Sequence, residues 1–252
     1  HAGKLSCPGL SETEFSRLKH GDVIQMSKQR TRTEVKTAID VSETAERKRG
    51  RPQAAQGTDL KLALLRSAID LFAERGFDGV SLSHVAEKAG ADKGLSRYYF
   101  GSKEALWIAA MEHLADCFAS DLNKALVVRT ATQTEALKAL IRAFITASAR
   151  WPQVSRVIVH DGAKHSDRSD FLQRHLVVPF YTVLKDLIAG AKSEGTLPNV
   201  SDRTIFFMIT HGGSFPMALP ILTNAIEGGD IRSSDALEHH SEAIIELLFS
   251  KA

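Results

Sequence analysis

The sequence predicts an all-α fold in which a small helical domain precedes a larger one. From Thr58 to the C-terminus, apolar residues recur three and four positions apart, which places them on one face of a helix. Residues that favour helix caps precede several of these runs, and glycines follow them. No alternating pattern of comparable strength predicts a strand. We therefore expect helices alone to form the core.

Four helices are expected at the start of the folded region. The first begins behind a Thr58 or Asp59 cap and ends at Gly76, where the apolar stripe stops. Caps and terminating glycines predict three further helices: from Ser81 to Gly90, from Asp92 to Gly101, and a long one from Ser102.

Five further helices are expected in the larger domain, at residues 135–151, 154–163, 170–194, 202–225 and 234–249. Pro179 predicts a kink in the third of them, and Gly195 ends it. Pro216 and Pro220 interrupt the fourth, and we expect this break to open backbone carbonyls toward a cavity. These features place the boundaries at a flexible extension over residues 1–46, a basic arm over 47–57, a small helical domain over 58–106 and a larger helical domain over 107–252.

Positive charge is concentrated in one part of the chain. The net charge is only +2, but residues 47–101 contain ten basic and six acidic side chains, whereas residues 1–46 contain seven of each. The densest stretch, RKRGRPQ over residues 47–53, directly precedes the first helix. Such a focus of charge favours an anionic partner.

Other sequence features narrow the class of protein. Cys7 and Cys117 form neither a disulfide framework nor a metal-ligand pair, which is typical of a reducing compartment. Neither a signal peptide nor an unbroken apolar span is visible, so we expect a cytoplasmic protein without membrane contact. No cofactor or metal motif is present.

The second and third helices have the features of a helix-turn-helix. Gly90 permits the turn between them, and the small Ala86 lets them approach closely. The stretch SLSHVAEKAGADKGLSRYYFGSKEAL, residues 81–106, resembles the DNA-binding signature of the TetR family of transcriptional regulators. AIDLFAERGFDGVS, residues 68–81, also matches.

The resemblance implies a set of DNA contacts. Residues that would face the operator are Lys93, Gly94, Leu95, Arg97 and Tyr98, and residues that would hold phosphates are Ser81, Ser83 and Lys103. The chain departs from the family at Ser96, where relatives usually have a large apolar residue, and at Arg97, where they commonly have tyrosine. The first departure predicts loose packing of the recognition helix unless Leu95 or a neighbour fills the space.

The basic arm contains an RGRP core similar to that of AT-hook peptides. Such arginines lie in a narrow, negative minor groove, so Arg49 and Arg51 are expected to contact the minor groove beside the site that Arg97 reads. The alternative is a solvated basic linker that binds phosphates weakly.

The resemblance also implies that the later helices enclose a small-molecule pocket and pair two subunits. Aromatic and polar residues that could line the pocket are Phe118, Phe144, His160, Phe180, Tyr181, Thr210, His211 and Ser214. A stripe on the last helix predicts the dimer interface: Leu237, Ile244 and Leu248. The alternative for this stripe is the core of a single subunit, and pocket candidates can equally be ordinary core residues.

These features together predict a homodimeric, sequence-specific DNA-binding transcriptional regulator. Repression of a palindromic operator and release by a small-molecule effector are the defaults that the family resemblance implies. An architectural DNA-binding protein without an effector is the alternative. An enzyme is disfavoured because GGSFP lacks the final glycine and the preceding strand of a nucleophile elbow.

Overall fold

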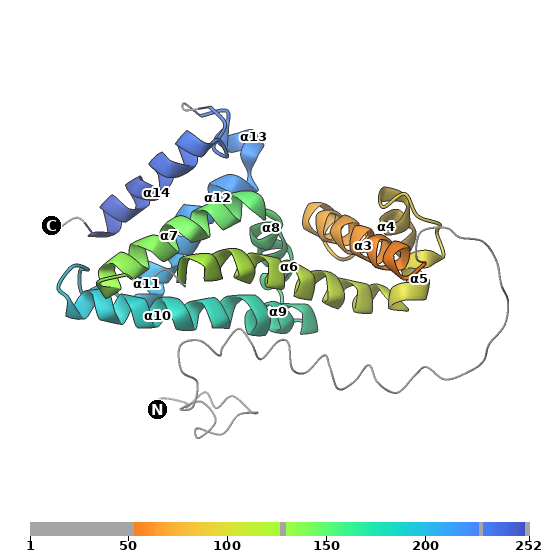
Figure 1. The fold of residues 1–252 in the computed structure, drawn as a ribbon, viewed down its shortest axis with the longest axis horizontal. Coiled ribbons are helices and arrows are strands. Elements are labelled where there is room, and N and C mark those ends of the chain that lie inside the picture. The colour runs from red at the N-terminus through yellow and green to blue at the C-terminus, as the bar shows by residue number, and fades with distance from the viewer. Residues whose placement is uncertain (1–52, 127–129, 227–228, 250–252) are drawn as a thin grey trace, which may run out of the picture. The chain divides into compact units, whose positions relative to one another are not determined.

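The computed structural model describes residues 53–126, 130–226 and 229–249, and all regular secondary structure in these ranges is helical (Figure 1). Contacts divide the chain into two units, residues 1–49 and 50–252, and every described residue belongs to the second. The predicted extension, residues 1–46, and the arm residues Arg49 and Arg51 lie outside the described residues. Within the described ranges, no helix has both the length and the apolar content needed to cross a membrane.

The small N-terminal domain, for which the sequence predicts DNA binding, contains α3 (Gln53–Arg75), α4 (Leu82–Lys88), α5 (Leu95–Phe100) and the start of α6 (Lys103–Leu126). The prediction that Thr58 or Asp59 caps the first helix is wrong, because α3 already begins at Gln53. Alanine and glutamine are strong helix formers, and QAAQ over residues 53–56 therefore extends the helix into the predicted arm. Gly76 ends α3 as expected, with a φ of +68°.

The third predicted helix also starts elsewhere than expected. Asp92 does not cap it, because α5 begins at Leu95 and Gly94 occupies the cap position without a side-chain hydrogen bond. Asp92 instead forms a turn in which its carbonyl oxygen accepts a hydrogen bond from the Leu95 N–H at 2.9 Å. The predicted cap of the next helix is confirmed, since Ser102 Oγ accepts a hydrogen bond from the Ala105 N–H at 3.1 Å.

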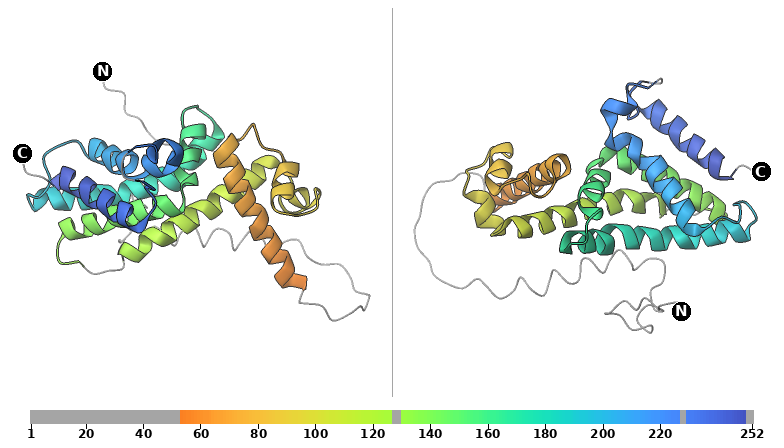
Figure 2. Two further views of the ribbon diagram at one scale, coloured as in Figure 1. Left: turned by 90° about the horizontal axis from the view of Figure 1, so that it is seen from above. Right: turned by 180° about the vertical axis from the view of Figure 1, so that it is seen from behind.

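The larger domain begins with the rest of α6 and continues through α7 (Gln133–Arg150), α8 (Gln153–Gly162), α9 (Asp167–Leu172), the π-helical η1 (Gln173–Val177), α10 (Val178–Ser193), α11 (Asp202–Phe207), the π-helical η2 (Met208–Gly212), α12 (Gly213–Ala218), α13 (Pro220–Thr223) and α14 (Ser234–Phe249). The last helix has the predicted bounds. Two views show α6 extending from the DNA-binding domain into the larger domain (Figure 2).

Two helices that were predicted as single elements are interrupted. The segment predicted over residues 170–194 consists of α9, η1 and α10, and Pro179 lies in the first turn of α10, where its missing N–H needs no partner. The π-helical segment before it absorbs the change of register. The segment predicted over 202–225 likewise divides into α11, η2, α12 and α13, and it breaks at Leu219, directly before Pro220.

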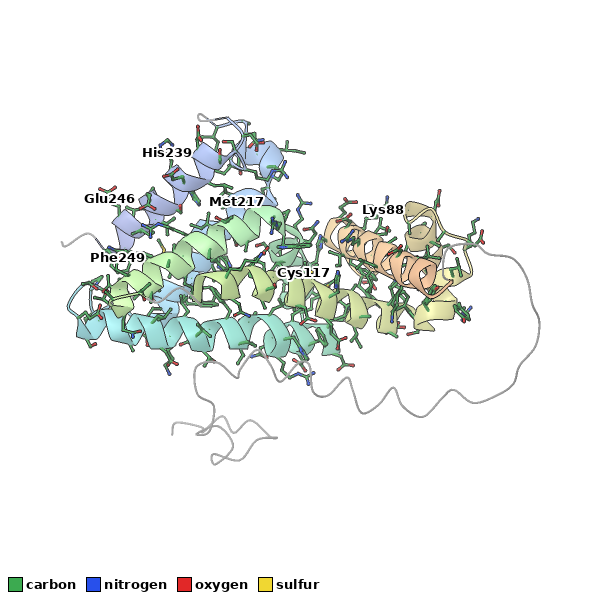
Figure 3. All side chains as sticks on the ribbon, viewed as in Figure 1. Lys88, Cys117, Met217, His239, Glu246 and Phe249 are labelled. Atoms are coloured by element: carbon green, nitrogen blue, oxygen red, sulfur yellow. The ribbon has the colours of Figure 1, made fainter. Side chains whose placement is uncertain are left out.

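Helix α7 lies at the centre of the larger domain and packs against α6, α10, α12 and α14. Leu137, Ile141 and Ile145 on its inner faces are completely buried. Figure 3 shows Met217 on the inner side of α12, whereas His239 and Glu246 project from the outer side of α14. This core fixes the positions of the helices that pack around α7.

Candidate functional site

The helix-turn-helix is held by the residues that the sequence indicated. Ser81 caps α4, because its Oγ accepts a hydrogen bond from the His84 N–H at 3.2 Å. Gly90 has a φ of +66° and allows the chain to reverse after α4. Ala86 is completely buried, and its carbonyl oxygen accepts a hydrogen bond from the Ala91 N–H at 2.9 Å. The small side chain and the positive φ thus position α5 against α4.

Helix α5 and the turn before it present most of the predicted base-reading residues to solvent. Lys93, Gly94, Arg97 and Tyr98 are exposed, and Tyr98 retains 80% of its accessible surface. Leu95 is half-buried and packs partly beneath the helix. The exposed set combines a lysine, an arginine and a tyrosine, which can contact phosphates and base edges when a helix enters a major groove.

Ser96 lies on the opposite side of α5 from the exposed residues. Its side chain is 0% exposed, so neighbouring residues cover it completely. Its hydroxyl has no hydrogen-bond partner among the described residues. The position therefore buries an unsatisfied polar group, and the expected loose packing stays a prediction.

The residues predicted to hold phosphates have different surroundings. Ser83 is exposed, whereas the hydroxyl of Ser81 is half-buried and engaged in its cap. Lys103 is also half-buried, and its Nζ lies 4.3 Å from the centre of the Phe77 ring. The Arg168 guanidinium lies 4.1 Å from the same ring, so Phe77 contacts cations from both α6 and α9.

A cavity of about 130 Å³ lies in the larger domain between α6, α7, α8, α10, η1 and the α11–α12 segment. Six phenylalanines contribute to its wall: Phe118, Phe144, Phe180, Phe206, Phe207 and Phe215. Of the predicted pocket residues, the structure brings together Phe118, Phe144, Phe180, Thr210, His211 and Ser214. The contributions of α8 and η1, such as Ser155 and Val177, were not predicted because they depend on tertiary packing.

Two predicted pocket residues do not line this cavity. His160 is exposed on α8 and faces the DNA-binding domain, where its Nδ1 lies 3.5 Å from the position that a Cβ on Gly76 would take. Tyr181 packs edge-to-face against Phe206, with ring centres 5.2 Å apart, and does not itself line the cavity. Both residues are therefore corrections to the predicted pocket.

The backbone carbonyls released by the two prolines are also not open to the cavity. Pro216 lacks the N–H that would bond to Gly212, and His240 Nε2 donates to the Gly212 carbonyl oxygen instead, at 3.0 Å. Thr223 Oγ1 similarly donates to the Pro216 carbonyl oxygen at 2.8 Å. The Arg156 Nε donates to the Ala218 carbonyl oxygen at 2.9 Å. Side chains from α8, α13 and α14 thus donate hydrogen bonds to the carbonyl oxygens at the break and hold these helices against α12.

The predicted dimer stripe on α14 partly contacts the core of its own subunit. Leu237, Ile244 and Leu248 are half-buried and pack against that core, and their place in a dimer interface stays a prediction. Large exposed apolar side chains occur along the α11–α13 segment and directly after it: Phe207, Met208, Phe215, Leu219, Ile221, Leu222 and Ile226. A concentration of exposed apolar residues on one segment favours association.

Helix α8 joins the cavity to the DNA-binding domain. One face contributes Ser155 and Ile158 to the cavity wall. At its start, Gln153 Nε2 donates to Asp70 Oδ1 of α3 at 2.8 Å. At its end, the buried Asp161 accepts a hydrogen bond from Arg168 Nε at 2.9 Å, and Arg168 stacks on Phe77. No local pattern predicts these partners, because the contact between α3 and α8 exists only in the folded chain.

Comparison with known proteins adds independent evidence. The model of the tetR family of bacterial regulatory proteins matches residues 64–110. The HTH-type transcriptional regulator RutR of Escherichia coli strain K12 is 30% identical over 193 residues, which cover 74% of this chain and 89% of that protein.

Solved structures have the same fold. AibR in complex with isovaleryl coenzyme A and operator DNA matches with a TM-score of 0.61 at 19% identity, over 77% of this chain and 100% of that one. The transcriptional regulator FadR from Bacillus subtilis in complex with stearoyl-CoA matches with a TM-score of 0.56 at 18% identity, over 75% and 97% of the two chains. Within the described residues, no group of three potential ligand side chains could hold a metal ion.

Proposed function

The chain belongs to the TetR family of bacterial regulatory proteins, and we propose that this DNA-binding transcriptional regulator acts as a homodimeric repressor that a small-molecule effector releases from a palindromic operator. The observation that carries the proposal is the presence of an exposed recognition helix and an aromatic cavity in one unit, connected by α8. The first element suits DNA reading, and the second suits a small ligand.

Operator reading is assigned to α5 and the turn before it. Arg97 is exposed, and its guanidinium can donate two hydrogen bonds to one guanine in the major groove. Lys93 and Tyr98 would extend the contact to neighbouring bases or phosphates. Ser83 is exposed near the start of α4, where it can reach the backbone of the duplex.

The arm that precedes α3 is assigned to the minor groove. Because α3 begins at Gln53, only a single residue separates Arg51 from the helix. Arginines at this position would extend the footprint into the groove beside the major-groove contacts, where A·T-rich sequence is narrow and strongly negative. Replacing Arg49 and Arg51 by alanine is expected to lower operator affinity and to reduce the slope of log K against log salt by about one to two units.

Dimerisation is assigned to the exposed apolar side chains of the α11–α13 segment rather than to the half-buried stripe of α14. A second copy would cover side chains such as Ile221, which is 87% exposed, and Leu222, which is 65% exposed. A two-fold dimer would place two copies of α5 in successive major grooves, about 34 Å apart. Half-sites one helical turn apart would then match the symmetry of the protein.

Effector binding and DNA binding would be coupled through α8. A ligand that contacts Ser155 and Ile158 acts on the same helix that holds α3 through Gln153. If the effector prefers an arrangement of α8 in which the two reading heads misfit the operator, it shifts the dimer toward that arrangement. By linkage, DNA lowers effector affinity by the same factor.

The test is a selection of random duplex DNA by the purified protein at near-physiological salt, followed by sequencing of the retained fragments. A palindrome retained by the protein and by the Arg203→Ala control, which changes an exposed arginine on α11, but lost in Arg97→Ala, would support the proposal. Retention without sequence preference, weakening steeply with salt, would refute operator reading and favour an architectural DNA-binding protein.

A further inference from the structure

The aromatic cavity admits only a small apolar group. Its volume is about 130 Å³, and an apolar cavity of about 150 Å³ accepts benzene. The rings of Phe144 and Phe180 stack with their centres 4.9 Å apart, and Phe118 meets Phe144 edge-to-face at 5.8 Å. The space therefore suits a single ring or a short branched alkyl group.

The hydroxyl groups around this cavity are already engaged as donors. Ser148 donates to the Phe144 carbonyl oxygen at 2.7 Å, and Thr210 donates to that of Phe206 at 2.9 Å. Ser214 donates to the Thr210 carbonyl oxygen, and Ser155 bonds to Ser214. A ligand's polar group therefore finds few donors within the aromatic wall, and burying it there unpaired would be unfavourable.

A second cavity of about 350 Å³ lies beside the first, under the connection between α8 and α9. Ile158 and Val177 line both cavities, so they form the boundary between the two spaces. Unlike the aromatic cavity, the second has charged side chains in its wall, Lys164 and Asp170, with His165 beside them.

The side chains of the second cavity indicate which polar group of a ligand could bind there. Neither Lys164 nor His165 has a hydrogen-bond or ion-pair partner in the part of the chain that the structure describes. Ser169 is engaged in the capping box with Ser166. Lys164 and His165 therefore remain available to an anion, while the Asp170 carboxylate in the same wall opposes a second negative charge.

We propose that the two cavities form one effector site for a small monocarboxylate, with an aryl or branched alkyl group in the aromatic cavity and the carboxylate beside Lys164 and His165. Ile158 and Val177 form the neck between the two parts of the ligand. This inference rests on the proposed function of the larger domain as a sensor, and it names the chemical class of the effector.

The proposed position of the carboxylate could also couple ligand binding to the N-terminal domain. Lys164 and His165 lie between Asp161 and Arg168 in the chain, and Arg168 links the buried Asp161 carboxylate to Phe77. A carboxylate bound at Lys164 and His165 would therefore lie on the segment between the two partners of this ion pair. Its binding is expected to affect the contact between Arg168 and Phe77 in the turn after α3.

Isothermal titration of the DNA-free full chain with two matched pairs tests the proposal: phenylacetate with phenylacetamide, and 3-methylbutanoate with 3-methylbutanamide. At least one carboxylate is expected to bind about tenfold more tightly than its amide, because hydrogen bonds to a charged group are the stronger kind. Lys164→Met is expected to erase this preference, Asp170→Asn to strengthen it, and the control Lys185→Met, on the exposed face of α10, to leave it unchanged.

Equal binding of carboxylate and amide, an undiminished preference in a folded Lys164→Met protein, or no binding of any of the four compounds would overturn the assigned class. Thermal unfolding of each variant without ligand verifies that it folds. The titration contains no DNA, so its failure leaves the operator selection unaffected. If the protein selects no palindromic DNA but still binds a carboxylate more tightly than its amide, the effector site is supported and the proposed role as an operator-binding regulator is not.

Discussion

Replacing Ser96 by alanine is expected to stabilise the protein. The serine hydroxyl is completely buried in the recognition helix and has no partner among the described residues. An unsatisfied buried polar group costs about 1–3 kcal/mol, and alanine adds about 0.5 kcal/mol of helix propensity over serine. The oxygen that is removed leaves too little space for a significant cavity penalty, so we expect a net gain of about 1–3 kcal/mol.

The assay is thermal unfolding at fixed protein concentration, with Ser120→Ala as the matched control. Ser120 lies on the exposed face of α6, so this variant gains the propensity of alanine without removing a buried hydroxyl. For a protein of this size, each kcal/mol corresponds to roughly 2–4 °C in the unfolding temperature. Ser96→Ala is expected to exceed the control by several degrees.

Ser96→Leu gives the opposite test of the same packing. If the space around Ser96 is closed, the larger side chain overpacks it and destabilises the protein by about 1–3 kcal/mol. If Ser96→Leu instead raises the unfolding temperature, the helix is loosely packed. That result, or a Ser96→Ala variant no more stable than Ser120→Ala, would refute the reasoning.

Three further predictions concern the larger domain. Hydrogen bonds from the Thr134 hydroxyl and from the backbone N–H groups of residues 133 and 134 lower the pKa of Glu194. The stabilisation by the ionised carboxylate is therefore fully present above the unfolded pKa and is lost as pH falls through the lower folded pKa. Glu194→Gln is expected to flatten the dependence of stability on pH below about pH 4.5, measured by acid unfolding. Arg168→Ala leaves the buried Asp161 carboxylate unpaired and is expected to destabilise the fold by about 3–5 kcal/mol in urea unfolding, whereas an undiminished stability would show that the pair is solvated. Ile221→Glu is expected to dissociate the dimer in analytical ultracentrifugation. Leu237→Ala is expected to lower the stability of the subunit and to leave the dimer intact. Dissociation by Leu237→Ala but not by Ile221→Glu would identify the α14 stripe as the interface.

The sequence predicted the helix-turn-helix well because its determinants are local. Ser81 and Ser102 cap helices through bonds three residues away, and the backbone at Gly90 has the positive φ that glycine permits. Predictions failed where two local signals competed. Asp92 is a favourable cap by type, but the turn at residues 92–95 uses its backbone carbonyl, and the helix starts at Leu95.

The candidate pocket was predicted only in part, because the direction in which a helix face points depends on contacts with distant residues. Residues such as Phe144 and Thr210 belong to helices whose central place follows from their apolar stripes, so they could be named from the sequence. His160 has the same residue type and spacing as a pocket residue, but the direction in which α8 faces decides that it meets Gly76 instead. That direction is set by contacts with other helices and has no local signature.

The sequence by itself determined the family, the helical fold and the helix-turn-helix, because caps, glycines and apolar periodicity act within a few residues of chain. Only the tertiary structure decided which side chains meet across long separations. Gln153 and Asp70 are 83 residues apart, and His240 reaches a carbonyl 28 residues away. The contact of Leu237 with the core of its own subunit belongs to the same class, because an apolar stripe specifies that a helix face is covered but not by which surface.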